Sequence, residues 1–170
     1  MMRLKKVSTK ILIVEDEIDI REGISEYLSE VGYDVMVAED GQEGIDLFKS
    51  NEFDLVLLDI KHINDAEHRK LTGASNKNIL AFARYLSDKQ IPVWIRHVVV
   101  RDITLRKDYL QELGQFIGSL KNVKALDVLP YHNMAIPKYD SLGIQYPLKD
   151  IPPTTKQEAL WARDVILRGM

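Results

Sequence analysis

Acidic residues follow two short apolar runs of the sequence, and these side chains are the ones best placed to do chemistry. Asp59 follows the run Leu55-Val56-Leu57-Leu58, and Glu15, Asp16 and Glu17 follow Ile11-Leu12-Ile13-Val14. A run that is apolar on both alternating faces is typical of a parallel strand covered by helices. Open α/β sheets and β/α barrels place their chemistry at the carboxyl ends of such strands. Taken alone, strand-end acids are more often solvated caps than a binding site.

Cysteine is absent from the sequence. Its absence excludes disulfides, thiolate zinc sites, a catalytic cysteine and cysteine-ligated iron–sulfur clusters. The four histidines, His62, His68, His97 and His132, give little support for zinc. His62 and His68 lie in one polar segment without a thiol ligand nearby, which is not a pattern typical of zinc sites.

The composition is that of an ordinary globular domain, and 170 residues predict a single α/β domain over residues 1–170. A net charge of −3 with mixed signs gives no electrostatic footprint for nucleic acid or an anionic membrane. No apolar run approaches the ~20 residues of a membrane span. The basic start, Met1–Lys6, is followed by only a short apolar run, which does not fit a signal peptide, so we expect a cytoplasmic protein.

Strand-like and helix-like segments alternate five times along the chain. Short apolar or β-branched runs predict strands over residues 10–14, 33–38, 53–61, 93–100 and 123–129. Helical spacing and capping residues predict helices over residues 18–31, 41–49, 75–87, 105–120 and 155–168, with 61–74 and 131–153 irregular. Thr154 or Thr155 is the expected N-cap of the last helix. Because helical crossovers impose parallel pairing, two architectures fit. One is a five-stranded, doubly wound, flavodoxin-like sheet of strand order 2-1-3-4-5, and the other is a partial β/α barrel.

Four segments in the first part of the chain form a specific combination: Ile11–Glu17, Gly32-Tyr33, Ala38–Gly41 and Asp54–Asp59. Through them, residues 1–60 resemble the N-terminal half of a response regulator receiver domain. The resemblance implies that Glu15, Asp16 and Asp59 bind Mg²⁺ and that Asp59 accepts a phosphoryl group. This chemistry is reasonable, because Mg²⁺ prefers oxygen ligands and keeps several waters, and a carboxylate can accept a phosphoryl group.

Two parts of that family's site have no match here. The family places a Ser or Thr after the fourth strand and a Lys after the fifth. This sequence has Val100-Arg101-Asp102 at the first position, with Thr104 only loosely placed, and Leu129-Pro130-Tyr131-His132 at the second. Asp59 is therefore expected to be a vestigial phosphoacceptor.

A second set of segments runs from Asp54 onward: Asp59–Asp65, Leu71–Gly73, Phe82–Leu86, Val93–Arg96, Val98–Val100, Leu129–His132, Lys138-Tyr139 and Leu142-Gly143. Through them, residues 54–170 resemble the C-terminal half of the glycyl-radical enzyme activases, the pyruvate formate-lyase activating enzymes most closely. Those are radical S-adenosylmethionine enzymes with a partial β/α barrel. The resemblance implies that Asp59, Lys61 and His132 lie around S-adenosylmethionine, so Lys61 and His132 are expected to be vestigial cofactor contacts.

The rest of that family's site is missing. Radical cleavage needs a cluster held by three cysteines, and the chain also has Arg101-Asp102 where the family usually has Pro-Gly. We therefore expect no iron–sulfur cluster, no radical chemistry and no enzyme activity.

The two resemblances share residues 53–60, so a single strand could serve both. This predicts a chimeric scaffold without a complete active site, built or selected to test the exchange of fold fragments, with a natural fusion as the alternative. No cofactor is required, although a divalent cation such as Mg²⁺ could bind at the strand tips. Two other functions stay open: a phosphoacceptor receiver domain of two-component signalling that uses Asp59, and a weak S-adenosylmethionine or anion binder.

Partners are predicted from charge and from the strand pattern. We expect no nucleic-acid or membrane partner, and an exposed sheet edge that could recruit a second copy as a homodimer. Side chains alternate along the strand 93–100, so Arg96 and His97 point to opposite faces. We expect at least one of them to be buried, and Arg96 to pair with Asp127 or Asp59 because an unpaired buried charge is costly.

Overall fold

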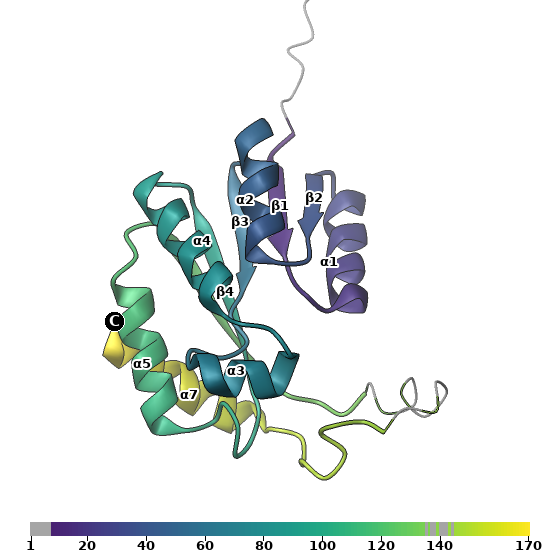
Figure 1. Cartoon of the computed structure of the whole chain (residues 1–170), viewed down its shortest axis with the longest axis vertical. Helices are drawn as coiled ribbons and strands as arrows, with labels where there is room; N and C mark the ends of the chain where they lie inside the picture. The colour runs from purple at the N-terminus through teal and green to yellow at the C-terminus, as the bar shows by residue number, and fades with distance from the viewer. Residues whose placement is uncertain (1–7, 135, 137–138, 140–142, 144) are drawn as a thin grey trace, which may run out of the picture. The chain divides into compact units, whose positions relative to one another are not determined.

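The protein is described by a computed structural model over residues 8–134, 136, 139, 143 and 145–170 (Figure 1). Five parallel strands form one sheet in the order β2-β1-β3-β4-β5. Their bounds are β1 Lys10–Val14, β2 Asp34–Ala38, β3 Leu55–Asp59, β4 Val93–Val99 and β5 Val123–Pro130. The open, receiver-like sheet predicted from the sequence is therefore confirmed.

Six helices are described: α1 Ile18–Glu30, α2 Gly41–Ser50, α3 Asp65–Thr72, α4 Lys77–Asp88, α5 Lys107–Gly118 and α7 Lys156–Gly169. Five of them were predicted, but α3 lies in a segment predicted to be irregular, and that prediction is wrong. The helix buries only His68, so it shows no apolar periodicity. Its ends are fixed instead by the Asn64 side chain, which accepts from two backbone N–H groups, and by Gly73 at φ 79°.

The described residues divide into two compact units, and each is described by itself. Among the described residues, unit 1 comprises 8–60, 77–95 and 120–125, and unit 2 comprises 61–76, 96–119 and those from 126 onward. Part of the second resemblance, at Lys138 and Leu142, and the basic start Met1–Lys6 lie outside the described residues. The single-domain interpretation stays a prediction.

Unit 1 is organised around β1, which pairs with β2 on one side and β3 on the other. Ile11, Ile13 and Leu57 point to one face of the sheet, where Ile24 and Leu28 of α1 pack against them. The residues that alternate with them, such as Leu12 and Leu58, face the opposite side and are fully buried. Both faces of the central strands are covered, which explains their continuous apolar sequence.

Helices α2 and α4, also in unit 1, approach each other closely through glycine. A Cβ added at Gly44 would lie 2.9 Å from the Phe82 ring, and one at Gly41 would lie 2.6 Å from the carbonyl oxygen of Asn78. Phe82 is buried and packs edge-to-face against Phe48. The small residues of α2 thus make room for the large residue of α4.

Unit 2 is built on the pair α5 and α7. A Cβ added at Gly114 would collide with the backbone oxygen of Ile166, so these helices touch through their backbones. Helix α7 begins with a capping box between Thr155 and Glu158, so Thr155, rather than Thr154, is the N-cap of this helix. The Arg101 guanidinium donates to the Glu158 carboxylate from Nε, at 2.9 Å, and from Nη2, at 2.7 Å. These two hydrogen bonds connect the loop after β4 to the first turn of α7.

Among the described residues, none of the helices combines the length and the apolar character that a membrane span requires.

Candidate functional site

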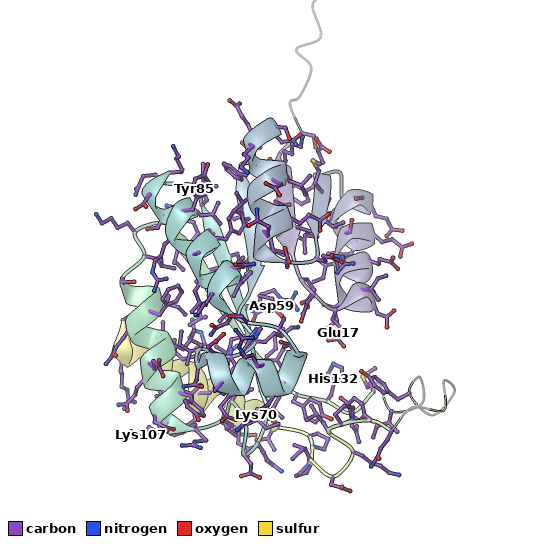
Figure 2. All side chains as sticks on the ribbon, viewed as in Figure 1. Glu17, Asp59, Lys70, Tyr85, Lys107 and His132 are labelled. Carbon is purple, nitrogen blue, oxygen red and sulfur yellow. The ribbon has the colours of Figure 1, made fainter. Side chains whose placement is uncertain are left out.

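The carboxyl ends of β1 and β3 bring two of the predicted acidic residues to one edge of unit 1. Val14 pairs with Leu58, so Glu15 and Asp59 are the next residues along adjacent parallel strands. Glu15 is 2% exposed and Asp59 is 7% exposed. Figure 2 shows Asp59 at the end of β3. Asp16, the third predicted ligand, is exposed.

The backbone around Glu15 is held by a residue that sequence reasoning missed. The Arg21 guanidinium on α1 donates to the carbonyl oxygens of Glu15, at 2.7 Å, and Asp16, at 3.3 Å. One carboxylate oxygen of Glu15 accepts from the backbone N–H of Glu17 at 3.1 Å. The turn that follows β1 is therefore fixed. The signal for Arg21 was its place in the first turn of a helix that begins just after the acids.

Three carboxylates do not converge here. Over the described residues, no group of three or more His, Asp or Glu side chains is arranged to hold a metal ion. Glu15 and Asp59 are the two buried carboxylates at this edge, while Asp16 lies on the surface. The predicted Mg²⁺ ligands are thus placed on neighbouring strand ends, and their role stays a prediction.

The Thr104 hydroxyl, the loosely placed match to the receiver family's Ser or Thr, is used by the backbone of unit 2. It accepts from the N–H of Val100 at 2.7 Å and donates to the carbonyl of Val98 at 2.9 Å. This closes the turn after β4 and buries the side chain. Pro130 is the last residue of β5 and lies close to the position at which the receiver family has a Lys.

Lys61 and His132, the predicted cofactor contacts, both lie in unit 2. Lys61 follows β3 by two residues and is half-buried. His132, labelled in Figure 2, follows β5 and is exposed. The backbone N–H of Tyr131 donates to the carbonyl of Val99 at 3.1 Å, which fixes the start of the segment that carries His132 beside the end of β4. Their contact with S-adenosylmethionine stays a prediction.

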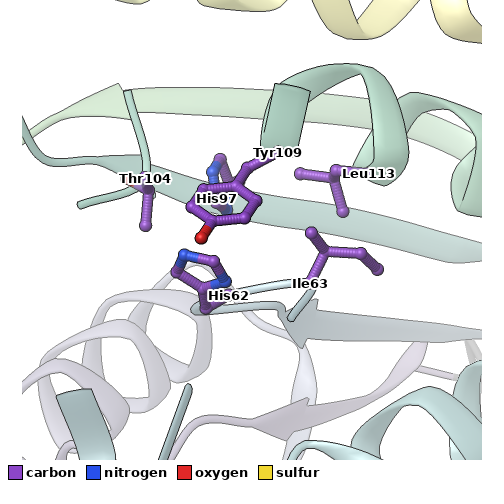
Figure 3. Close-up of a pocket in the computed structure, with 6 residues that line it drawn as sticks. All are labelled: His62, Ile63, His97, Thr104, Tyr109 and Leu113. Carbon is purple, nitrogen blue, oxygen red and sulfur yellow. The ribbon is translucent and has the colours of Figure 1, made fainter. Parts of the chain in front are cut away.

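A buried histidine cluster lies in unit 2 and was not predicted as a site. Six side chains of this cluster line a small space (Figure 3): His62, Ile63, His97, Thr104, Tyr109 and Leu113. The space that they enclose is too small for a water molecule. His62 contacts the Tyr109 ring edge-to-face, with 4.5 Å between the ring centroids. This cluster is part of a packed core and offers no room for a ligand.

The alternation predicted for β4 is observed. His97 is buried among the cluster, and Arg96 on the other face is half-buried. The buried polar group of this strand is therefore the histidine. Pairing of Arg96 with Asp127 or Asp59 stays a prediction.

Comparison with known proteins gives two different results for the two ends of the chain. The family model of the response regulator receiver domain matches residues 11–62. The C-terminal part is 55% identical over 102 residues to the pyruvate formate-lyase-activating enzyme of Streptococcus mutans serotype c (strain ATCC 700610 / UA159). The enzyme of the same name from Staphylococcus epidermidis (strain ATCC 12228 / FDA PCI 1200) is 53% identical over 100 residues. The chain is therefore similar to one family over residues 11–62 and to another over its C-terminal part.

Neither match covers the whole of either protein. The aligned residues are 60% and 59% of this chain, and the chain spans only 39% and 40% of the length of these two activating enzymes. The receiver model ends at residue 62, just beyond β3. The crossover predicted within residues 53–60 stays a prediction.

Solved structures support the fold of this two-part chain. A domain of pyruvate-formate lyase-activating enzyme from Bacteroides vulgatus ATCC 8482 aligns over 95% of both chains with a TM-score of 0.64 and 16% identity. NtrX from Brucella abortus aligns over 94% of this chain and 29% of its own, with a TM-score of 0.53 and 18% identity. At these identities the likeness shows the fold alone.

Proposed function

We propose that this protein is a chimeric α/β scaffold without a complete active site, which binds a divalent cation at the carboxyl ends of β1 and β3. The observation that carries the proposal is the burial of Glu15 and Asp59 on adjacent strand ends. Two like charges at neighbouring buried positions repel each other, and a cation between them would relieve that repulsion. A scaffold made by exchanging fold fragments also accounts for a receiver-domain match that ends at residue 62 and an activating-enzyme match in the C-terminal part.

The cation most compatible with this edge is Mg²⁺. It binds readily through one or two carboxylates and keeps several of its waters, so it does not require a complete protein cage. Asp16 is exposed and could join as a further ligand. With so few protein ligands, we expect weak binding in the millimolar range.

The test is the thermal stability of the intact protein in a Mg²⁺ titration. At ten times its dissociation constant, the ion should raise the free energy of unfolding by about 1.4 kcal/mol. Asp59→Asn should abolish this increase, because it removes one of the two carboxylates at the proposed site. Asp164→Asn, a change at an exposed position of α7, is the matched control and should retain the full response. A wild-type protein that does not respond to Mg²⁺ would contradict the proposal.

We further propose that the chain is not an enzyme. It contributes no cysteine to an iron–sulfur cluster, and the Thr104 hydroxyl is occupied by the backbone of Val98 and Val100. Isothermal calorimetry with S-adenosylmethionine tests whether Lys61 and His132 still bind the cofactor of the activating enzymes. Heat that disappears in both Lys61→Ala and His132→Ala variants would favour a binding protein over a bare scaffold.

A further inference from the structure

The ring of His62 is buried and contacts the backbone at both nitrogens. It is 1% exposed. Nδ1 accepts from the backbone N–H of Asn64 at 3.0 Å, and Nε2 lies 3.4 Å from the carbonyl oxygen of Ile103. A backbone N–H can only donate, so Nδ1 must be without a proton, and the ring proton lies on Nε2. The backbone thus selects the neutral ring.

The turn that His62 holds is also the start of α3. The Asn64 side chain accepts from the N–H groups of Ala66 and Glu67, and so caps the helix. Any displacement of Asn64 that follows loss of the His62 bond therefore also loosens the first turn of α3.

The turn at His62 and Ile63 also binds Asn76, which follows α3 in the chain. The Asn76 amide donates to the carbonyl oxygens of His62, at 3.0 Å, and Ile63, at 2.6 Å. Residues 61–76, which we call the α3 segment, are therefore fastened at both ends to the backbone around His62. Few of its own side chains are buried, since within the helix only His68 is. The segment depends on these hydrogen bonds more than on apolar packing.

The groups around His62 do not favour a charge on its ring. Glu67 and His68 face it from α3, His97 from β4, and Arg106 and Tyr109 from the start of α5. Burial lowers the pKa of His62, and the charges of His68 and Arg106 lower it further, while the Ile103 carbonyl and Glu67 act in the opposite direction. The space between these side chains has no room for a water molecule that would solvate an imidazolium.

We propose that protonation of His62 opens the α3 segment, which makes this histidine an acid-sensitive anchor within unit 2. A second ring proton would sit on Nδ1 and face the Asn64 N–H, so that two donors would meet where one hydrogen bond had been. The ring must then leave the cluster to reach water, and the cap of α3 is lost with it. The expected result is a local opening of residues 61–76, which includes Lys61, while α5 and α7 stay folded.

Hydrogen exchange of the intact protein between pH 7.5 and 5.5 tests this inference. After correction for the intrinsic pH dependence of exchange, protection of the α3 amides should fall as the pH drops below about 6.5, by up to tenfold per pH unit. The amides of α5 should keep their protection. Protection of α3 that does not change with pH would overturn the proposal.

Variants and ring spectra separate His62 from the other histidines. His62→Asn places an amide oxygen near the Asn64 N–H and cannot be protonated, so it should remove the pH dependence, whereas His132→Asn should leave it intact. Nitrogen NMR of the unmodified protein should show the His62 proton on Nε2 at pH 7.5, whether or not the variant folds. A proton on Nδ1, or an acid response that persists in His62→Asn, would overturn the proposal.

Discussion

Helix α1 of the receiver-like part and helix α7 of the activating-enzyme-like part are similar in length but differ in burial. Over Ile18–Glu30, all of which the structure describes, α1 buries none of its residues, and Tyr27 is 65% exposed. Helix α7 buries Ala159, Ala162, Val165 and Ile166 against α5. Apolar burial is the main source of helix stability in a folded protein. The difference indicates that apolar packing against α5 stabilises α7, whereas α1 is only lightly covered.

The largest expected effect on stability comes from adding a methyl group at the contact between α5 and α7, which tests the difference in packing between α7 and α1. Gly114→Ala should lower the free energy of unfolding by about 3 kcal/mol, because the new Cβ collides with the backbone of Ile166 and no flexible side chain can yield. Urea unfolding measures the change. The control is Gly23→Ala in α1, where nothing lies within 4 Å, and it should be neutral or stabilising by up to about 1 kcal/mol. Equal losses in both variants would contradict the difference between the two helices.

A second substitution tests the contact between the two sequence parts within unit 1. Gly44→Ala should lower the free energy of unfolding by about 1–3 kcal/mol, since its Cβ meets the ring of Phe82. Phe82→Leu should recover part of the loss in the double variant, which a double-mutant cycle measures. Strictly additive losses would mean that α2 and α4 do not pack as described.

Asp102 offers a stabilising change in the activating-enzyme-like part. It adopts φ 61°, a left-handed conformation that glycine adopts without strain, and the activase family usually has Pro-Gly at positions 101 and 102. Asp102→Gly should raise the free energy of unfolding by up to about 1 kcal/mol. Thermal unfolding measures the shift, and Asp88→Gly, near the end of α4, should instead destabilise. A loss of stability in Asp102→Gly would show that its carboxylate matters more than its backbone.

The smallest expected effect concerns the ion pair of α7. The Arg101 guanidinium, together with the hydrogen bonds from Thr155, lowers the pKa of Glu158 from 4.5 to about 2. A lowered carboxyl pKa contributes stability above pH 4.5, and that contribution is lost as the pH falls from 4.5 toward 2. Glu158→Gln should therefore melt slightly below the wild type at pH 7, and the gap should close in acid. A gap that is the same at pH 7 and pH 3 would argue against the pairing.

The strands and their order could be predicted because each strand coincides with a short apolar or β-branched run in the sequence. The runs Ile11–Val14 and Leu55–Leu58 are apolar on both faces, and the helical crossovers between them leave few possible topologies. Helix α3 was missed because its periodicity is polar, although its caps, Asn64 and Gly73, were visible in the sequence. Capping residues at both ends of a short polar segment are thus a better signal than apolar spacing there.

The site was only partly predictable for a different reason. Glu15 and Asp59 come at the ends of neighbouring strands, so topology alone brings them to one edge. The side chains of Arg21, Thr104 and Asn76 each donate to a backbone carbonyl that lies between five and fourteen residues earlier in the chain. No local sequence pattern specifies those partners. The burial of His97 rather than Arg96 likewise depends on which face of β4 the helices cover.

Intact-mass spectrometry after incubation with acetyl phosphate and Mg²⁺ tests the central claim most directly, namely that joining the two sequence parts left no finished active site. The account predicts an unchanged mass, because Asp59 is present without the receiver family's Ser or Thr and Lys in their usual places. A phosphoryl adduct that appears in the wild type and is absent from Asp59→Asn would contradict it.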